Sequence, residues 1–493
     1  MFSRNGIAAD HTARHASGAG MRTRHAFAMR MSRRQFFHRG FVAAGAFAGL
    51  ESFLRTGWAA DAVVGEGLAE AGGVAKPIGF GDLLPDPAGI FDLPAGFSYR
   101  VISRAGERTE MGYTVPGQFD GMAAFPGPNG QVVLVRNHEL DPSQVTMGPF
   151  QARKPEPTIC YDNGNGFSPG QGGTTTVVYD PNTGITIRQY LSLAGTTRNC
   201  GGGPTPWGSW ISCEETTEIA GPVKGRNGAA YVNAQDHGFA FEVPASATMR
   251  IAEPVPLRAM GRFNREAVAV NPDTGLIYQT EDSQEGVLYR FIPSTPGKLR
   301  EGGRLQALCL PDFKGDTTNW NQRDVSVGDQ LRVTWVDIKD PLNNPAQQAR
   351  AAGAARFTRG EGIWLSGERL WFICTDGGAR RKGQIWQLDL YHKANSLSLF
   401  CEPDDAHLLE NGDNLTQSPW GDLLVCEDAV GDDADPGQHV VGVTLSGRPY
   451  RLGRNALNSS ELAGICCAPD GKTLFVNIQK PGLTLAIAGP WKI

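Results

Sequence analysis

The sequence predicts an all-β protein, a six-bladed β-propeller in which one hairpin is repeated around a central channel. Three observations lead to this prediction. Sustained helical periodicity is scarce after residue 75, and 63 glycines and 32 prolines make the chain rich in turns. One hairpin pattern recurs six times along the chain. With 493 residues, 40% of them hydrophobic, the chain is long enough to bury a large core.

The N-terminal segment has the features of an export signal. Arg33 and Arg34 are the twin arginines of a Tat signal, and the apolar run Phe41–Leu50 follows them. Residues 1–60 are therefore expected to be a disordered extension plus a Tat signal peptide, which the Tat translocase recognises during export. This pathway carries folded proteins, so a cofactor can be inserted before export. The mature protein is expected to be periplasmic or secreted.

The rest of the chain is expected to form one domain. Residues 61–90 are predicted to be a linker or N-terminal arm, and residues 91–493 a single propeller domain that carries the site. No segment after the leader has 18 uninterrupted apolar residues, so no stable membrane span is expected after processing. The net charge is −5 by count and the chain has no basic stripe, which argues against a nucleic-acid partner.

The clearest copy of the repeated hairpin is Asn264–Asp282. Two strands flank the turn Asn271–Gly275, in which proline presets φ and glycine supplies a positive φ. Glu266 opens the first strand, and Glu281 and Asp282 close the second. An antiparallel hairpin brings its two ends to one edge, so these acids are expected side by side. The other five copies start at Asp120, Asn199, Arg359, Asp413 and Glu461 and end at Glu139, Glu215, Asp376, Asp428 and Gln479.

Outer strands are predicted after most of the hairpins. They cover Val287–Ile292, Val333–Ile338, Gln384–Leu390 and Val440–Thr444. Phe97–Arg104 is predicted to be an early strand, and the last strand, Thr484–Ala488, is expected to pair with N-terminal strands and close the ring.

Acidic side chains are expected to gather where the six hairpins meet. In a propeller, the start of each blade's first strand and the end of its partner strand lie at one mouth of the channel. Carboxylates that converge there repel one another unless cations neutralise them, and sites with several oxygen ligands suit Ca²⁺. The sequence therefore predicts a metal site at this mouth. The candidate carboxylates are Asp120, Glu139, Glu214, Glu215, Glu266, Glu281, Asp282, Glu361, Asp376, Asp413, Glu427, Asp428 and Glu461.

Cys200 stands where the other copies of the hairpin place a carboxylate. A thiolate is a poor ligand for Ca²⁺ but a good one for iron or zinc, so the ring could hold two kinds of metal. An inert buried cysteine is the alternative. Cys213, Cys374 and Cys426 each precede an acid-tipped strand end, which indicates three equivalent buried thiols rather than a disulfide framework.

Arginines lie among these acids. Arg359 is two residues before Glu361 and faces the same way at a strand period of two, and Arg136 adjoins Asn137. Each arginine could simply pair with a carboxylate, but the guanidinium fork also suits phosphate, so an anionic, phosphorylated substrate is indicated. The chain has no HExxH, Gly-x-Ser-x-Gly, Walker A or GxGxxG motif, which weakens zincin, Ser-His-Asp and nucleotide-binding alternatives.

Taken together, these motifs resemble the PhoX-type alkaline phosphatase family over about residues 75–493. The resemblance rests on Arg136–Glu139, Asn199–Gly202, Trp210–Glu215, Asn264–Ala267, Thr280–Asp282, Arg359–Gly362, Thr375–Gly378, Asp413–Leu415, Cys426–Asp428 and Pro469–Gln479. Members of the family are six-bladed propellers that hydrolyse phosphomonoesters with Ca²⁺ and Fe³⁺ at one end of the channel. The twin-arginine leader is also similar to theirs.

The resemblance implies roles for individual residues. Cys200 is similar to a thiolate ligand of iron, and Glu266 and Glu361 to carboxylates that bind metal directly. The residues expected to act on the phosphate ester are Arg359, Arg136 and Asn137. Further metal ligands, implied by the resemblance or expected at the channel mouth, are Asn137, Glu139, Glu214, Glu281, Asp376, Asp413 and Glu427. The expected reaction is metal-assisted phosphoryl transfer to an oxide or water, because the sequence offers no protein nucleophile in its place.

Two alternatives stay open from the sequence. One is a Ca²⁺-dependent lactonase or phosphotriesterase on the same scaffold, which does not need Cys200; iron in the protein would argue against it. The other is a non-enzymatic propeller that binds a partner or an anion. Hydrolysis of p-nitrophenyl phosphate with and without calcium separates a phosphatase from that case.

Overall fold

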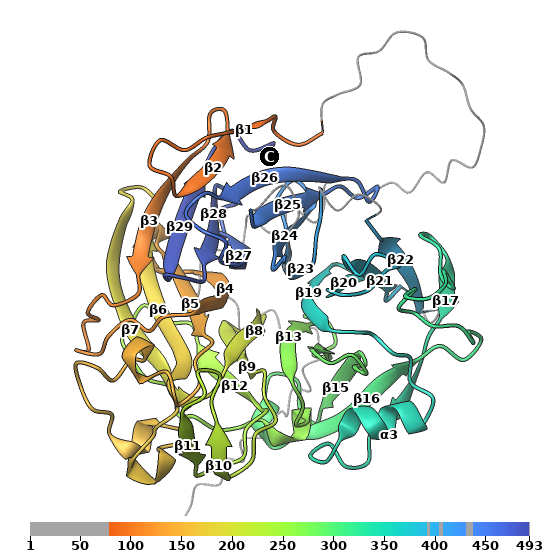
Figure 1. The fold of residues 1–493 in the computed structure, drawn as a ribbon, viewed down its shortest axis with the longest axis horizontal. Coiled ribbons are helices and arrows are strands. Elements are labelled where there is room, and N and C mark those ends of the chain that lie inside the picture. The colour runs from red at the N-terminus through yellow and green to blue at the C-terminus, as the bar shows by residue number, and fades with distance from the viewer. Residues whose placement is uncertain (1–77, 392–394, 404–407, 430–436, 493) are drawn as a thin grey trace, which may run out of the picture. The chain divides into compact units, whose positions relative to one another are not determined.

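Six antiparallel sheets of three or more strands surround a central channel, and Figure 1 looks down this channel. The structure is a computed structural model that describes residues 78–391, 395–403, 408–429 and 437–492. Each of the six sheets is one blade, so the predicted all-β six-bladed propeller is confirmed. The predicted Tat signal and extension, residues 1–60, lie outside the described residues, as do residues 61–77 of the predicted arm.

Each blade contributes one of the six predicted hairpins to the channel. The first strands of blades 1 to 6 line the channel and contact one another around the ring. They are β4 (Phe119–Pro126), β8 (Asn199–Pro204), β13 (Arg265–Val270), β19 (Gly360–Ser366), β23 (Gly412–Gln417) and β27 (Leu462–Cys467). Their hairpin partners are β5 (Val132–His138), β9 (Ser209–Glu214), β14 (Ile277–Glu281), β20 (Arg369–Cys374), β24 (Leu423–Glu427) and β28 (Thr473–Ile478).

Further strands complete each blade toward its outer edge. In blades 1 to 3 they are β6 (Gly172–Asp180), β7 (Ile185–Thr196), β12 (Ala240–Pro244), β15 (Tyr289–Pro293), β16 (Gly303–Cys309) and β18 (Thr334–Asp337). In blades 4 to 6 they are β21 (Gln384–Asp389), β22 (Ser396–Cys401), β17 (Gln330–Arg332), β25 (His439–Val443), β26 (Pro449–Asn455) and β29 (Leu483–Ala488). A separate hairpin, β10 (Gly221–Lys224) and β11 (Ala230–Asn233), is inserted between β9 and β12.

Helices are few and short in the described part of the chain. The one α-helix there is α3 (Pro345–Ala351). The 3₁₀ helices are η1 (Pro128–Gly130), η2 (Val145–Met147), η3 (Pro157–Ile159), η4 (Gly164–Gly166), η5 (Arg258–Met260) and η6 (Leu299–Glu301).

The N-terminal strands close the ring. β3 (Ser98–Arg104) pairs with β29 as the outermost strand of blade 6, so this blade is built from both ends of the propeller, as predicted. β2 (Phe91–Pro94) pairs with β26 of blade 5, and β1 (Leu83–Leu84) pairs with β2. The described end of the predicted arm is thus joined to blade 5 by main-chain hydrogen bonds.

The hydrophobic core lies between neighbouring blades. Between blades 3 and 4, Tyr278 and Leu308 belong to one buried cluster with Phe372 and Trp386. A sheet packed on both faces needs apolar residues on both faces, so the strands that pair with the first strands are almost entirely buried. β5 is buried at every position, including its polar C-terminal end.

Glycines let the first strands approach one another closely at the channel. A Cβ atom on Gly201 would lie 2.4 Å from Glu266 Oε1 and 2.7 Å from the Glu266 carbonyl oxygen. A Cβ atom on Gly362 would lie 2.5 Å from the Asp413 carbonyl oxygen. Gly201 follows Cys200 and Gly362 follows Glu361 in the chain. The missing side chains therefore let candidate ligands from adjacent blades come together.

Candidate metal centre

All six hairpins break their register at the same place, near the start of the first strand. The irregularities fall after Phe119, Asn199, Arg265, Gly360, Gly412 and Ala463. A β-bulge re-aims the side chain of the extra residue. The residues directly after the break are Asp120, Cys200, Glu266, Glu361, Asp413 and Gly464, and the first five line one pocket at the channel mouth.

A second set of acids comes from the ends of the partner strands. Glu139, Glu215 and Asp428 directly follow β5, β9 and β24, and Asp282 follows β14. With Glu461, which precedes β27, they complete a pocket of about 280 Å³ lined by nine carboxylates. Its basic residues are Arg198, Arg226, Arg359 and Lys480. Acidic residues therefore outnumber basic ones about two to one at this mouth of the channel.

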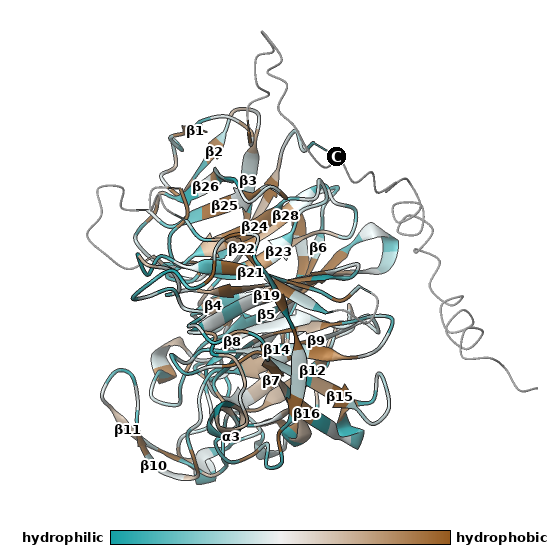
Figure 2. Cartoon of the chain, turned by 90° about the vertical axis from the view of Figure 1, so that its right-hand side faces the viewer, coloured by the Kyte–Doolittle hydropathy of each residue, from teal (hydrophilic) through white to brown (hydrophobic). Residues whose placement is uncertain are grey.

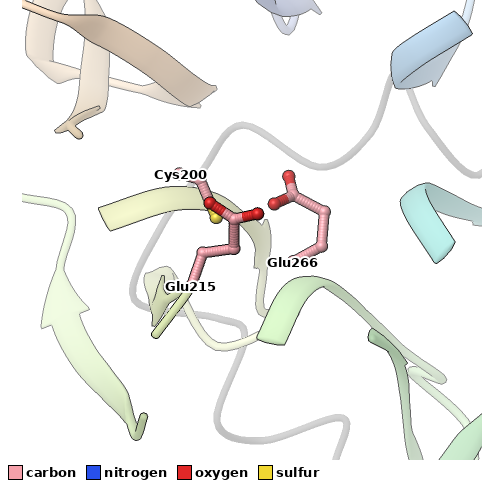
Figure 3. Close-up of side chains that lie close together, drawn as sticks. All are labelled: Cys200, Glu215 and Glu266. Atoms are coloured by element: carbon pink, nitrogen blue, oxygen red, sulfur yellow. The ribbon is translucent and has the colours of Figure 1, made fainter. Parts of the chain in front are cut away.

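Four groups of ligand atoms in this pocket are close enough to share a cation. Within each group, one ligand atom per residue lies within 4.8 Å of the others. Figure 3 shows one group, in which the carboxylates of Glu215 and Glu266 point toward each other beside the thiol of Cys200. The other groups are Asp120 with Glu139 and Glu461, Glu266 with Glu361 and Asp413, and Asp413 with Asp428 and Glu461.

The electrostatics of the pocket fit bound cations. Burial first, and repulsion from neighbouring carboxylates second, raise the pKa values of Glu266, Glu361 and Asp413 well above the ordinary range. The same two causes raise the pKa of Asp120 to about 8, and they raise the pKa of the Cys200 thiol well above its ordinary value. Cations at these positions would offset both the desolvation and the repulsion.

Two arginines bridge pairs of acids on different sides of the pocket. Arg359 Nε donates to Asp282 at 2.8 Å, and its Nη2 to Glu361 at 3.1 Å. Arg198 Nη2 donates to Glu215 at 2.7 Å, and its Nε lies 3.7 Å from Glu139. The guanidinium groups thus lie among the candidate ligands, where they can reach an anion bound to the same cations.

Six of the predicted site residues come together in the pocket. They are Glu139, Cys200, Glu266, Arg359, Glu361 and Asp413. The remaining six, Arg136, Asn137, Glu214, Glu281, Asp376 and Glu427, do not line it.

Glu214, Glu281 and Glu427 are each displaced from the pocket by a single position. Successive side chains of a strand point to opposite faces, and in each hairpin the next residue, Glu215, Asp282 or Asp428, points into the pocket instead. Glu214 contacts His237 Nδ1 at 2.7 Å, and Glu427 contacts His439 Nδ1 at 2.9 Å. Glu281 accepts a 2.9 Å hydrogen bond from Tyr289 Oη.

Three further predicted residues also lie outside the pocket: Asp376, Arg136 and Asn137. Asp376 accepts a 2.6 Å hydrogen bond from Thr358 Oγ1, while Thr375 lines the pocket. Arg136 is fully buried between blades 1 and 6, where it lies 3.5 Å over the Phe119 ring and donates to one threonine hydroxyl of each blade.

Asn137 acts on the backbone that carries the thiol. Its Nδ2 donates to the carbonyl oxygens of Cys200 and Gly201 at 2.7 and 2.6 Å, and its Oδ1 accepts from Trp210 and Ser212. The first two hydrogen bonds hold the start of β8 and the other two join Asn137 to β9, so Asn137 orients the backbone of Cys200.

Two pocket arginines, Arg198 and Arg226, were not predicted from the sequence. Arg198 could have been found, because Arg198-Asn199-Cys200 repeats the spacing of Arg359-Gly360-Glu361. Non-glycine residues with positive φ lie two positions before four of the bulged residues: Gln118 at 48°, Arg198 at 52°, Arg359 at 44° and Asn411 at 46°. This strained turn aims both arginines into the pocket. Arg226 lies on the inserted hairpin, outside the repeat, and no spacing marks it.

His237 is expected to make stability depend on pH. Burial lowers its pKa, but Glu214 and Asp162 raise it more, to about 10 from 6.5. A pKa that is raised in the folded state stabilises the folded protein. This stabilisation is complete below pH 6.5, decreases as the pH rises above 6.5, and is lost above about pH 10. His237→Gln should therefore lower the free energy of unfolding by about 3 kcal/mol near pH 6, where the partner carboxylates are charged, and by much less above pH 10.

Urea unfolding of wild type and His237→Gln across this pH range checks the prediction. A stability difference that stays constant with pH would contradict it.

All nine cysteines lie among the described residues, and no disulfide joins any two of them. In the described part of the chain, no helix is both long and apolar enough to cross a membrane.

Comparison with known proteins identifies the family. The sequence profile of alkaline phosphatase PhoX matches residues 78–183 and 181–482, nearly the whole described chain. The chain belongs to the PhoX alkaline phosphatase family. A search of curated protein sequences found no match. The family membership confirms the predicted resemblance and the predicted enzyme class, a phosphoric monoester hydrolase.

One solved structure supports the fold, and two further ones are weaker matches. PhoX of Pseudomonas fluorescens, solved with the transition-state analogue vanadate, has a TM-score of 0.61 and 17% identity, over 81% of this chain and 96% of that chain. A gluconolactonase from Xanthomonas campestris scores 0.35 with 11% identity, over 84% and 99% of the two chains. The periplasmic gluconolactonase of Pseudomonas aeruginosa scores 0.35 with 12% identity, over 78% and 89%.

Proposed function

We propose that this PhoX-family chain hydrolyses small phosphomonoesters in the channel-mouth pocket, with Ca²⁺ and Fe³⁺ held by the carboxylates and the thiol. The observation that carries the proposal is the convergence of nine carboxylates, one thiol and three arginines from all six blades on one pocket. A propeller that only binds a partner does not require so many buried acids, whose mutual repulsion costs stability.

The donor set indicates which residues would hold which metal. Cys200, Glu215 and Glu266 combine a sulfur with two carboxylates, and such a donor set suits iron. The other three groups offer only carboxylate oxygens, which suit Ca²⁺. When bound, the metals would polarise the phosphoryl oxygens and neutralise the charge that develops on them in the transition state.

The chain's own residues bind and orient the substrate. Arg359 and Arg198 approach the pocket from blades 4 and 2, and each is held by hydrogen bonds to carboxylates. A guanidinium fixed in this way can donate two hydrogen bonds to one phosphoryl group without first losing conformational freedom. Asn137 fixes the backbone of Cys200, so the thiol enters the pocket in one orientation.

Chelation tests the proposal. The untreated protein is expected to hydrolyse p-nitrophenyl phosphate, to lose this activity after treatment with a chelator, and to regain it when Ca²⁺ is added. Loss should be nearly complete, because the carboxylates of the empty pocket repel an anionic substrate. Full activity in the presence of excess chelator would contradict a role for Ca²⁺.

We also propose export by the Tat pathway to the periplasm or the exterior. The twin arginines Arg33 and Arg34 support this, as does a buried pocket that is best filled while the protein folds. Replacing both arginines by lysine is expected to keep the precursor in the cytoplasm, and cell fractionation with an antibody checks this. Normal export of the double variant would contradict the proposal.

A further inference from the structure

The inserted hairpin β10–β11 is the one two-stranded sheet in the described part of the chain. Its strands pair from Gly221 with Asn233 to Lys224 with Ala230, and residues 225–229 form its tip. In Figure 2 it stands away from the blades at the lower left. Because it is additional to the strands of blade 2, the propeller fold itself does not require it. We call it the blade-2 arm.

The tip of the blade-2 arm is fixed to blade 1. The backbone N–H of Arg226 donates to Asp141 Oδ2 at 3.0 Å, and Asn227 Nδ2 donates to the Ser143 carbonyl oxygen at 3.2 Å. Asp141 is 1% exposed and also accepts from the Ser143 N–H at 2.8 Å. A Cβ atom on Gly225 would lie 2.3 Å from Ser143 Oγ, so the contact is close. The arm therefore bridges two blades at the edge of the pocket.

This bridge places the side chain of Arg226 in the pocket. Its Nη2 donates to Glu139 at 2.6 Å and lies 3.7 Å from Glu215. The side chain is 44% exposed, compared with 23% for Arg198. Arg226 is therefore at the solvent side of the acids, where a substrate enters. Among the described residues, only Nη2 of its guanidinium has a protein hydrogen-bond partner, which leaves the donors of Nε and Nη1 for a ligand.

We propose that Arg226, presented by the blade-2 arm, binds the phosphoryl oxygens of the phosphomonoester and of the phosphate product. The proposal rests on the function proposed above. Arg226 contacts acids of blades 1 and 2, whereas Arg359 contacts acids of blades 3 and 4, so the two guanidinium groups face the pocket from different blades. A doubly charged phosphoryl group between them can accept hydrogen bonds from both.

The arm offers a matched control. Lys224 lies on the same arm, carries the same charge and is exposed outside the pocket. Arg226→Gln, Arg226→Lys and Lys224→Gln are compared with wild type in three ways. KM and kcat are measured for p-nitrophenyl phosphate, the affinity for inorganic phosphate is measured by calorimetry, and calcium and iron are measured by elemental analysis.

Arg226→Gln is expected to raise KM and to weaken phosphate binding by about 10-fold, the effect of losing one charge-assisted hydrogen bond at a partly exposed site. Its kcat and metal content should stay near the wild-type values. Arg226→Lys should recover part of the affinity because the charge remains. Lys224→Gln should change nothing by more than about twofold, as is usual for a surface charge.

Two outcomes would overturn the proposal. Unchanged phosphate affinity in Arg226→Gln would show that the residue does not contact the anion. Loss of metal from Arg226→Gln in step with its loss of affinity would make Arg226 a residue that positions Glu139. If the proposed phosphatase function is wrong, wild type will not hydrolyse the ester. Phosphate binding that depends on Arg226 would still identify the anion site in that case.

Discussion

Glu266→Gln is expected to lower kcat/KM for p-nitrophenyl phosphate by about three orders of magnitude, which corresponds to about 4 kcal/mol of transition-state stabilisation. Glu266 belongs to two of the four ligand groups, one with Cys200 and Glu215 and one with Glu361 and Asp413. An amide keeps the size of the side chain but removes a negative charge from both groups. Steady-state kinetics together with metal content measures the effect.

Glu281→Gln is the matched control. Glu281 closes the same hairpin and is also buried, but it accepts a hydrogen bond from Tyr289 outside the pocket. Burial raises the pKa of Glu281 to about 7, so a neutral side chain there costs little near neutral pH. This variant should keep its metals and its rate. Equal losses in the two variants, or an active Glu266→Gln, would contradict the assignment of the ligands by register.

Cys200→Ala is expected to remove iron and to reduce phosphatase activity by about two orders of magnitude or more. Burial and nearby carboxylates raise the pKa of this thiol, so only a bound metal makes its thiolate form favourable at neutral pH. Calcium should be retained in part, because the three all-carboxylate groups do not contain the thiol. Elemental analysis of the purified variant measures both metals.

Cys213→Ala controls for the loss of a buried thiol. Cys213 lies on β9 of the same hairpin, but it belongs to the apolar cluster shared with blade 3. The Cys213→Ala variant should lose some stability and keep its iron. If Cys200→Ala kept full activity and iron content, the role of Cys200 as iron ligand would be wrong.

The fold could be predicted because each blade repeats one local pattern. The turn at Asn271–Gly275, the acid-tipped strands and their sixfold recurrence are visible in the sequence without any long-range contact. Ring closure by Leu483–Ala488 and Ser98–Arg104 followed from the same repeat. The inserted hairpin between β9 and β12 does not follow the repeat and was not predicted.

The site was harder to predict because it depends on the side-chain direction at single positions. Where two acids are adjacent, as at Glu214 and Glu215, the sequence does not show which one faces the channel. The strand register in the structure directs Glu215 toward the pocket and Glu214 toward His237. The bulge at the start of each first strand, which directs Cys200 and Glu266 inward, is likewise a property of pairing and not of composition.

The other differences between the predicted site and the site in the structure concern buried polar residues. Arg136 and Asn137 stand beside Glu139 in the sequence, yet the middle strand of a blade is covered on both faces and keeps them inside. Arg136 contacts threonine hydroxyls and an aromatic ring, and Asn137 contacts main-chain carbonyls near Cys200. Residues close to a candidate ligand in the sequence therefore include some that only support the pocket from outside as well as some that line it.

Elemental analysis of the active enzyme, purified after export in its folded form, tests the central claim most directly. The pocket built by the six hairpins predicts calcium and iron together in each active molecule, and the loss of iron and of part of the calcium from Glu266→Gln. Protein that hydrolyses p-nitrophenyl phosphate at full rate while containing neither metal would contradict the account.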